Sequence, residues 1–346
     1  MTRRIAITGA TGFLGRHVLT ALQADGWQPR VLVRKPMPGK TGNEPDFLND
    51  MEKIERITGD LDDREALERL VKGVDAVLHM AGVVKAATAQ AFLSVNALGT
   101  ERLAKAWRQE APAARFVLVS SMAAREPKLS DYAFSKAEAE KRLRARAGDG
   151  DWRIVRPAAI YGPGDRETLT IFKMADAAFQ PMLNAAGARV CLVHARDVAG
   201  AIVATLNDPE PHSVREIIDA RSDGYRWDEL ASAAARALGR APRPYRVPAS
   251  LLRITGYLGA LFSALSGRAA MISPGKVREI LHPDWSSSDN AEKPIPLWKP
   301  QITLNDGFCE TVAWYREAGW LKPRRLSRAM PDPHKHSFSR SSHQPQ

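Results

Sequence analysis

Cysteine is scarce in this sequence, with Cys191 and Cys309 as the only two among 346 residues. Two isolated cysteines do not form a disulfide framework or a Cys-x-x-Cys zinc site, and they are typical of a reducing compartment. A run of about 20 apolar residues is also lacking, so a membrane-spanning helix is not expected. We therefore predict a cytoplasmic protein with no bound metal.

Acidic residues are too few to balance the basic ones, since 39 Asp and Glu stand against 50 Lys and Arg and leave a net charge of +11. The excess is concentrated, because residues 236–280 carry +7 and residues 322–346 carry +5. The second segment has few apolar residues, so we predict a disordered basic tail over 322–346. No recognition motif accompanies this charge, so nucleic acid is not expected as a partner.

Strand-like and helix-like patterns alternate over residues 1–157, which predicts a Rossmann-type doubly wound parallel sheet with helices on both faces. After Pro157 the alternation loosens, and we expect a smaller C-terminal substrate-binding lobe over 158–321, with a helix over 195–207 that packs back on the sheet. The apolar runs are Ile5–Thr8, Arg30–Val33, Ile54–Thr58, Ala76–His79, Phe116–Val119 and Ile154–Val155. The helical patterns between them are Phe13–Ala24, Arg64–Lys72, Ala89–Arg108 and Asp131–Ala147. Further patterns predict a strand over Arg189–Val193 and a helix over Trp227–Leu238 that ends at Gly239.

A glycine-rich segment with the spacing Gly-x-x-Gly-x-x-Gly follows the first predicted strand and opens the first predicted helix. Glycines there permit a tight turn and a close approach of the backbone to a pyrophosphate, which binds at the helix N-terminus. An ordinary strand–helix turn is the alternative, but the position in the alternating pattern favours a dinucleotide. The candidate cofactor contacts of this loop are Thr8, Gly9, Thr11, Gly12, Phe13, Leu14 and Gly15.

The end of the second predicted strand bears on the choice of dinucleotide. It reads Val33-Arg34-Lys35, with no acidic residue to bind a ribose 2′-hydroxyl. Basic residues there favour a 2′-phosphate, so NADP is preferred over NAD, although NAD stays open. Further cofactor contacts are expected after the third and fourth strands, at Asp60, Leu61, Ala81 and Gly82.

Tyr132 and Lys136 lie four residues apart near the start of a predicted helix, a spacing that puts both on one face. A nearby ammonium favours the phenolate, so Tyr132 is a candidate general acid or base. Ser121 follows the fifth predicted strand, at the sheet edge where ligands bind. A surface Tyr–Lys pair and a turn-capping serine are the plainer interpretations, although Ser120 is as good a candidate for the cap.

These motifs, together with Asn96 and the segment Arg156-Pro157 to Gly164, resemble the extended short-chain dehydrogenase/reductase family over about residues 3–320. The resemblance implies that Tyr132 exchanges the proton and that Lys136 holds the ribose and lowers the pKa of Tyr132. It further implies that Ser121 orients the substrate and that Asn96 supports a proton-relay water. The backbone at Pro157, Ala158 and Ile160 would flank the nicotinamide, and a homodimer would be usual.

Residues typical of the dehydratases and the sugar epimerases of this family are absent here, which limits the reactions expected of this protein. Met122 and Ala123 stand where dehydratases carry acidic residues, and Arg125 and Glu126 replace a Tyr-Gly pair of the sugar epimerases. The pattern is closest to 3β-hydroxysteroid dehydrogenase and dihydroflavonol reductase-like members. We therefore expect a reductase or dehydrogenase acting on a ketone or secondary alcohol of an apolar compound, with a ketosphinganine or ceramide-type ketone as the specific hypothesis.

Two alternatives stay open at this point. In a nucleotide-sugar epimerase, Arg166 would bind a diphosphate; in a non-catalytic NADP-binding scaffold, the retained Ser121, Tyr132 and Lys136 would have no use. Val83 and Lys85, which follow the fourth predicted strand, are the other candidate substrate contacts.

Residues 249–267 form an apolar stretch inside the +7 segment, nearly uncharged from Ile254 to Leu265. The stretch is too short to span a bilayer but long enough to lie at its interface. It predicts a peripheral contact with the inner face of a membrane, because anionic headgroups attract the flanking arginines. A helix that closes the substrate pocket is the alternative.

Overall fold

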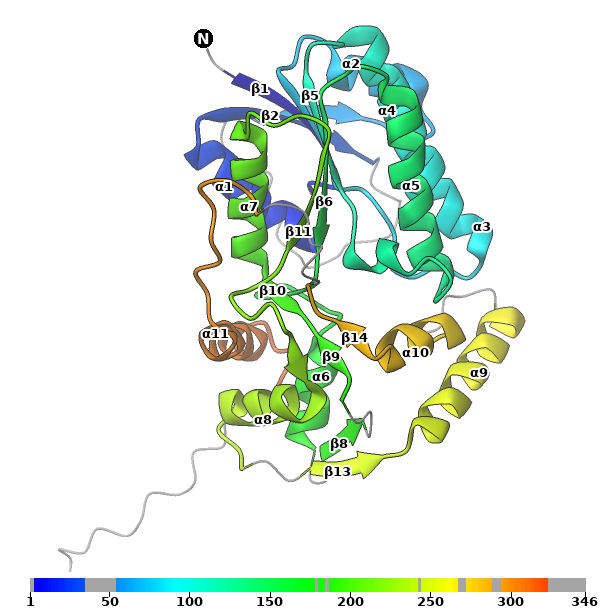
Figure 1. Cartoon of the computed structure of the whole chain (residues 1–346), viewed down its shortest axis with the longest axis vertical. Coiled ribbons are helices and arrows are strands. Elements are labelled where there is room, and N and C mark those ends of the chain that lie inside the picture. Colours follow the sequence, from blue (N-terminus) through cyan, green and yellow to red (C-terminus); the bar gives the residue numbers. More distant parts are fainter. Residues whose placement is uncertain are drawn as a thin grey trace, which may run out of the picture.

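A seven-stranded parallel sheet lies at the centre of the computed structural model, which describes residues 3–34, 54–177, 180–183, 187–241, 244–266, 272–287 and 294–322 (Figure 1). The strand order is β11-β6-β5-β4-β1-β2-β3, and it reverses between β1 and β4, the position where such sheets bind ligands. The predicted Rossmann-type fold is confirmed. The strands are β1 (Arg3–Thr8), β2 (Trp27–Val33), β3 (Glu55–Thr58), β4 (Ala76–His79), β5 (Arg115–Val119), β6 (Trp152–Pro157) and β11 (Ser213–Ile217).

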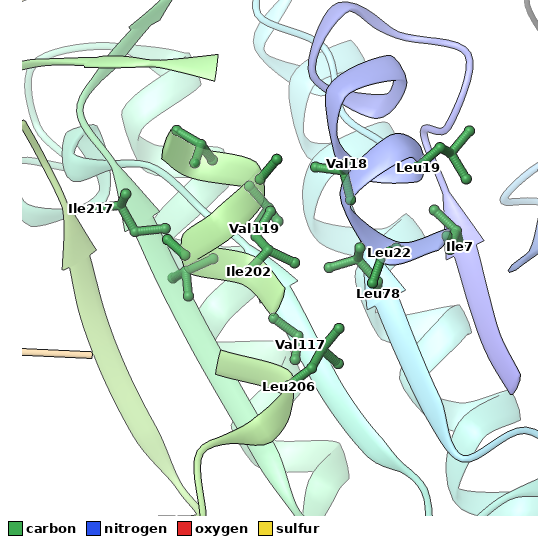
Figure 2. Packing of buried hydrophobic residues seen from close by; sticks show 14 of the residues in the cluster. Ile7, Val18, Leu19, Leu22, Leu78, Val117, Val119, Ile202, Leu206 and Ile217 are labelled. Atoms are coloured by element: carbon green, nitrogen blue, oxygen red, sulfur yellow. The ribbon is translucent and has the colours of Figure 1, made fainter. Parts of the chain in front are cut away.

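Helices cover both faces of the sheet. On one face lie α1 (Phe13–Ala24) and α7 (Ala195–Asn207), and on the other lie α2 (Arg64–Val71), α4 (Gly99–Glu110) and α5 (Asp131–Ala147). Both faces of the central strands are buried, so β4 and β5 are apolar almost throughout rather than alternating. Figure 2 shows the first core, where strand residues such as Ile7, Leu78 and Val117 meet side chains of α1 and α7.

The predicted helix over Ala89–Arg108 is divided in the structure. It consists of α3 (Ala89–Phe92), a π-helical turn η1 (Leu93–Leu98) and α4. A π-turn inserts an extra residue into the helix, and such insertions often accompany functional sites. Here the turn carries the buried Asn96.

A single strand over Arg189–Val193 is a wrong prediction. Arg189–Val190 forms β9, which pairs with β12 (Tyr225–Arg226) and β14 (Asp284–Trp285), while Leu192–His194 forms β10, which pairs with β7 (Ala159–Tyr161). The buried Cys191 separates the two, so one apolar run serves two small sheets.

The seventh strand of the sheet, β11, was not found in the sequence. It reads Ser-Val-Arg-Glu-Ile, and its Arg215 is buried in an ion pair with Asp208, so the strand lacks the apolar run used to find the others. Because β11 and α7 both lie beyond residue 157, the chain returns to the sheet after entering the lobe. The domain boundary at 157 stays a prediction.

The C-terminal lobe packs helices around an aromatic cluster formed by Tyr161, Phe172, Phe308 and Tyr315. Gly239 ends α8 in the left-handed conformation, as expected for a helix C-cap. The predicted tail over 322–346 lies, apart from Lys322, outside the described residues. The remaining elements are the 3₁₀ turn η2 (Met122–Arg125), α6 (Leu169–Asp176), β8 (Gln180–Leu183), α8 (Trp227–Leu238), β13 (Pro244–Val247), α9 (Ala249–Ser266), α10 (Pro274–Leu281) and α11 (Leu304–Glu317).

Candidate active site

The glycine loop between β1 and α1 has no room for side chains. Gly9 has φ +79°, and a Cβ there would lie 2.6 Å from the backbone nitrogen of Ala81. A Cβ on Gly15 would lie 2.2 Å from the carbonyl oxygen of Ala10. Both contacts are shorter than real Cβ atoms show, so glycine is required for the turn and for the packing of α1 on the sheet.

The start of α1 has the chemistry of an anion site. Gly12 is the N-cap and supplies no side-chain acceptor, so the first amides of the helix, including those of Phe13 and Leu14, have no capping partner. Exposed Thr11 lies directly before this cap. Unsatisfied amides and the positive end of the helix dipole fit a pyrophosphate at this position.

Thr8, at the end of β1, belongs to a buried chain of hydrogen bonds. The Thr8 hydroxyl is 2.6 Å from His79 Nδ1, and His79 Nε2 is 3.0 Å from the Thr100 hydroxyl. Thr100 donates to the Asn96 carbonyl oxygen, so it accepts from His79, whose proton therefore sits on Nε2. Burial lowers the pKa of His79 to about 3, so the ring is neutral. Each group in this series of hydrogen bonds therefore has a fixed role as donor or acceptor.

Asn96 links the segment after β4 to α5, the catalytic helix that carries Tyr132 and Lys136. Its Oδ1 accepts from the Val83 amide at 2.8 Å, and its Nδ2 donates to the Val83 carbonyl oxygen and to the Ser135 hydroxyl. A Cβ on Gly82 would lie 3.0 Å from the same Oδ1. The amide therefore binds protein groups, and its role in a proton-relay water stays a prediction.

The residues after β2 and β3 that are predicted to contact the cofactor have different surroundings in the structure. Arg34 is exposed at the end of β2, and Lys35 lies outside the described residues. The Asp60 carboxylate accepts from the amides of Asp62 and Asp63 and shapes its own turn, while Leu61 packs against Gly99 of α4. The cofactor roles of these residues stay predictions.

Tyr132, Lys136 and Ser121 meet at the carboxyl edge of the sheet. Ser121 lies near enough to Tyr132 to act on its pKa, and Lys136 Nζ donates to the carbonyl oxygen of Val119 at 2.8 Å. The Tyr132 ring packs edge-on against Phe92, with ring centres 6.2 Å apart. The three residues of the motif are thus brought together from β5 and α5.

The expected lowering of the Tyr132 pKa by Lys136 is not observed. Burial raises the pKa of Tyr132 to about 12, with the Ser121 hydrogen bond acting against it and the charge of Glu279 acting with it. Burial also lowers the pKa of Lys136 to about 8, opposed by the charge of Glu140. The phenol is therefore protonated at neutral pH, which is the state of a proton donor.

Ser121 caps the turn after β5, and Ser120 makes a different contact. Ser121, rather than Ser120, caps the following turn, since its hydroxyl accepts from the Ala123 amide at 3.1 Å. Ser120 donates instead to the buried carboxylate of Glu140 at 2.6 Å. Capping leaves the Ser121 hydroxyl hydrogen available to donate, so the cap and a substrate-orienting role are compatible.

Glu140 and Glu279 are two buried carboxylates near the motif that the sequence did not reveal. Glu140 holds both Ser120 and the guanidinium of Arg156, which donates from Nε and Nη2 at 2.9 and 2.7 Å. Glu279 of α10 accepts from Ser130, the residue that caps α5. Glu140 lies on α5 itself, one turn after Lys136, whereas Glu279 comes from α10. The partners Arg156 and Ser130 that give both carboxylates their roles become apparent only in the folded chain.

The segment after β6 runs along the carboxyl edge of the sheet. Pro157 ends β6, the Ala158 amide donates to the Ile217 carbonyl oxygen at 2.9 Å, and Ile160 pairs with Val193 between β7 and β10. This course is compatible with the position beside the nicotinamide that the resemblance implies.

The predicted substrate contacts Lys85 and Arg166 already have protein partners. Lys85 forms an ion pair with Glu167 at 2.8 Å, and the Arg166 guanidinium lies 4.7 Å from the ring centre of Trp320. Their roles as substrate contacts, like that of Val83, stay predictions.

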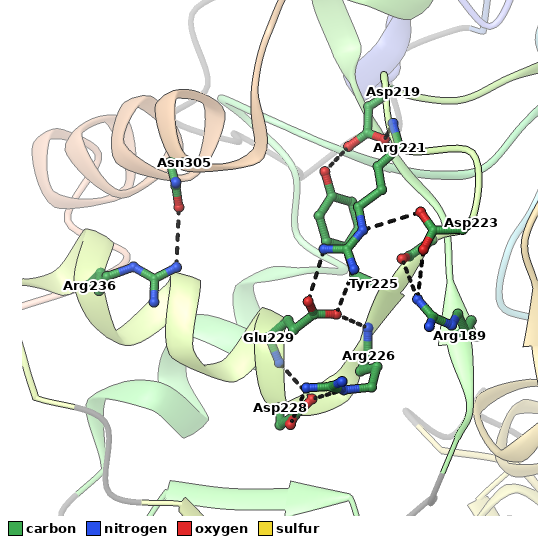
Figure 3. Close-up of polar contacts among 11 residues, drawn as sticks. Arg189, Asp219, Arg221, Asp223, Tyr225, Arg226, Asp228, Glu229, Arg236 and Asn305 are labelled. Atoms are coloured by element: carbon green, nitrogen blue, oxygen red, sulfur yellow. Dashed lines mark hydrogen bonds and ion pairs between the residues drawn. The ribbon is translucent and has the colours of Figure 1, made fainter.

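Two surface cavities of about 450 and 380 Å³ lie in the C-terminal lobe, away from the motif. Figure 3 shows the ion pairs around them, in which Arg221 contacts Asp223 and Glu229. Tyr225 closes this region by donating to Asp219 at 2.6 Å. Because Arg221 and Arg226 there are matched by carboxylates and Arg236 donates to the Asn305 side chain, we interpret these contacts as stabilising the lobe. In the described part of the chain, no group of three His, Cys, Asp or Glu could hold a metal ion.

The glycine loop and the Ser–Tyr–Lys arrangement on this sheet define an NAD(P)-dependent oxidoreductase of the extended short-chain type. The chain belongs to the NAD dependent epimerase/dehydratase family, whose model matches residues 5–219.

Relatives with known names extend the match beyond that family model. A ceramide reductase from Caulobacter vibrioides (strain NA1000 / CB15N) is 45% identical over 320 residues, which cover 92% of this chain and 96% of that protein. A UDP-glucose 4-epimerase from Vibrio cholerae is 23% identical over 343 residues, covering 92% and 97%. The crystal structure of gox2253 matches with a TM-score of 0.71 and 21% identity over 93% of this chain and all of that one, which supports the fold alone.

Proposed function

We propose that this protein reduces the ketone of a ceramide-type lipid to a secondary alcohol with NADPH. The observation that carries the proposal is the 45% identity to a ceramide reductase over 92% of the chain. The assembled Ser121, Tyr132 and Lys136 support catalysis rather than a binding scaffold, because each has the contacts its role requires.

The residues present fit a dinucleotide, as the crowded Gly9 turn and the uncapped start of α1 indicate. When bound, the nicotinamide supplies the hydride that adds to the carbonyl carbon. Tyr132 gives its hydroxyl proton to the carbonyl oxygen, while Ser121 donates a hydrogen bond to the same oxygen. Lys136 uses one N–H on Val119 and has others for the ribose, and its charge stabilises the tyrosinate left by the transfer.

An assay of NADPH oxidation tests the proposal directly. We expect NADPH oxidation with a 3-oxo-ceramide and weaker oxidation with 3-ketosphinganine. UDP-glucose has no ketone to reduce, so the epimerase alternative is tested separately by the formation of UDP-galactose, which we do not expect. Tyr132→Phe should reduce the rate by about 100-fold or more, because it removes the proton donor. Unchanged turnover in that variant, or preference for the nucleotide sugar, would contradict the assignment.

We further propose a preference for NADPH through Arg34, which is exposed at the end of β2 where a 2′-phosphate would lie. A charged contact of this kind corresponds to about tenfold or more in affinity. Arg34→Ala should therefore raise the KM for NADPH by that factor and leave the KM for NADH unchanged. An equal effect on both cofactors would exclude the phosphate contact.

The nucleotide-sugar alternative has less support in the site. Arg166 stacks on Trp320 and Lys85 pairs with Glu167, so a diphosphate would have to displace existing contacts. The epimerase relative is also only 23% identical.

The remaining predictions concern surroundings and assembly. A cytoplasmic location is supported by the two free cysteines, Cys191 and Cys309. None of the described helices is long and apolar enough to cross a bilayer. The homodimer and the peripheral membrane contact through residues 249–267 stay proposals, and residue 267 lies outside the described part.

A further inference from the structure

Helix α9 presents its large apolar side chains to solvent. Seven of them are between 50% and 80% exposed, and they recur at spacings of three and four residues, which places them on one helix face. Monomeric soluble proteins rarely expose a continuous surface of this kind unless it has a partner. The seven residues, called the α9 apolar face below, are Leu251, Ile254, Tyr257, Leu258, Leu261, Phe262 and Leu265.

The inner side of α9 carries small residues instead. Gly256 faces α10 so closely that a Cβ there would lie 2.8 Å from Val277 and 3.4 Å from Pro274. A helix of a soluble domain normally turns its large apolar residues inward and its polar ones outward. Here seven large apolar side chains are exposed, while the close contact with α10 is made at Gly256 and Leu252 is half-buried. Packing within the fold therefore does not explain the apolar face. Figure 1 shows α9 at the edge of the molecule, beside α10.

We propose that the α9 apolar face inserts into the interfacial region of an anionic phospholipid bilayer. The helix has 18 residues and does not qualify as a membrane span, so it would lie in the plane of the interface. In the sequence, α9 lies within residues 236–280, which carry a net charge of +7, and Arg253 on α9 itself is exposed. Anionic headgroups complement this charge, whereas a second copy of the same basic surface would repel it.

Docking of the α9 apolar face would bring α10, and through it the catalytic helix α5, near the bilayer. The use of this arrangement in catalysis rests on the proposed lipid substrate. α10 packs against α9 and contacts the start of α5, where Glu279 accepts from Ser130 and Arg278 donates to the Leu129 carbonyl oxygen. Tyr132 lies two residues after Ser130. A lipid with long acyl chains would thus pass from the bilayer to Tyr132 along α9 and α10 without crossing bulk water.

Vesicle sedimentation tests the docking without depending on the reaction. The wild-type protein should sediment with vesicles of phosphatidylcholine mixed with phosphatidylglycerol, and less with phosphatidylcholine alone. The variant Leu258→Ser with Phe262→Ser should lose about tenfold or more of this binding, because two inserted side chains are removed. Met174→Ser changes an exposed apolar residue on α6 and is the matched control, expected to bind as the wild type does.

Reduction of a short-chain, water-dispersed 3-oxo-ceramide separates docking from catalysis. The double variant should reduce this substrate at the wild-type rate but reduce a long-chain analogue embedded in vesicles more slowly. Vesicle binding without any reduction would contradict the proposed function and leave docking standing. The docking proposal would be overturned by wild-type protein that does not bind the vesicles. It would also be overturned by a dimer in gel filtration that the double substitution dissociates.

Discussion

His79 shows how one buried residue orders the site without taking part in the reaction. It accepts from Thr8, below the glycine loop, and donates to Thr100, one turn after Asn96. This chain requires a neutral ring with its proton on Nε2. Because burial lowers the pKa of His79 from 6.5 to about 3, protonation is opposed by the fold.

The first prediction is a loss of stability in mild acid that depends on His79. Below pH 6.5 the unfolded chain binds a proton at this histidine and the folded protein does not, so stability falls as the pH decreases from about 6.5 toward 3. Between pH 7.5 and 5.5 this residue alone should cost about 1.4 kcal/mol.

Urea unfolding of the wild type and of His79→Gln at both pH values measures this contribution of His79 to the free energy of unfolding. Glutamine can accept from Thr8 and donate to Thr100, but it does not titrate. The variant should be less stable than the wild type at pH 7.5 and should lose about 1.4 kcal/mol less on acidification. Equal losses in the two proteins would show that His79 is not the titrating group. His194, whose pKa burial lowers to about 4, contributes equally to both.

The reactive residues could be found from the sequence because their relation is local. Tyr132 and Lys136 are one helical turn apart, and Ser121 directly follows a recognisable strand. The pKa values could not be found in this way, since they depend on burial and on Glu279, more than 140 residues away. The same holds for Glu140 with Arg156, which only the packed sheet brings together.

Among the secondary-structure elements, the β1–α1 loop is defined by contacts that only glycine permits. Gly9→Ala should abolish dinucleotide binding, because φ +79° and the 2.6 Å approach to Ala81 both exclude a Cβ. The quenching of tryptophan fluorescence by NADPH would measure the loss. The control is Gly26→Ala in the turn before β2, where φ is +81° but no atom lies within 4 Å of the added Cβ. It should cost stability but keep binding; normal binding by Gly9→Ala would contradict the assigned site.

Helix α10 sets the electrostatics of the catalytic helix through Glu279. Its negative charge raises the pKa of Tyr132, so Glu279→Gln should lower that pKa while keeping an acceptor for Ser130. Two alkaline losses of activity are expected, one near pH 8 where Lys136 loses its charge and one at higher pH where Tyr132 ionises, and only the second should shift to lower pH in the variant.

A pH profile of kcat distinguishes this positioning role from a structural one. Glu279→Asp, which retains the charge, should restore the wild-type profile at least in part. A variant with a lower rate but an unshifted second alkaline limb would show that Glu279 acts only by holding Ser130.

Elements with a strong local pattern were placed correctly, and those shaped by tertiary contacts were not. Helices α1 and α5 have the predicted bounds: α5 begins after its cap Ser130 and ends at Gly148, and α1 is bounded by the glycine loop and by Gly26. The π-turn around Asn96 preserves an apolar pattern that reads as one helix, so it was missed. Strand β11 was missed because its buried Arg215 is neutralised by Asp208 and Glu210, which a strand pattern does not show.

For the molecule as a whole, the chain passes repeatedly between the sheet and the lobe. After β6 it enters the lobe, returns as α7 and β11, and leaves again before α8. The two parts therefore share segments rather than a single linker, and we expect them to unfold together. The boundary at residue 157 stays a prediction; β11, which lies beyond it in the sequence, joins the sheet by pairing with β6.

Asp197 is the residue that most directly ties the lobe to the sheet. It lies buried in α7, and its two carboxylate oxygens accept from the amides of Gln301 and Ile302, each at 3.0 Å, just before α11. Hydrogen bonds to a charged acceptor are among the stronger ones, and their loss leaves two amides without a partner. Asp197→Ala should therefore destabilise the protein by about 3 kcal/mol, and Asp197→Asn, which keeps one oxygen, by less.

Urea unfolding followed by the fluorine NMR signals of 5-fluorotryptophan at Trp314 and Trp320, which lie in the lobe, and by NADPH binding reports on the two parts separately. If the lobe and the sheet are one cooperative unit, both signals should be lost at the same urea concentration in the wild type and at a lower, still shared, concentration in Asp197→Ala. A variant in which the fluorine signal is lost while NADPH still binds would show that the lobe unfolds alone. In that case the tie at Asp197 would be local, and the shared segments α7 and β11 would not couple the two parts.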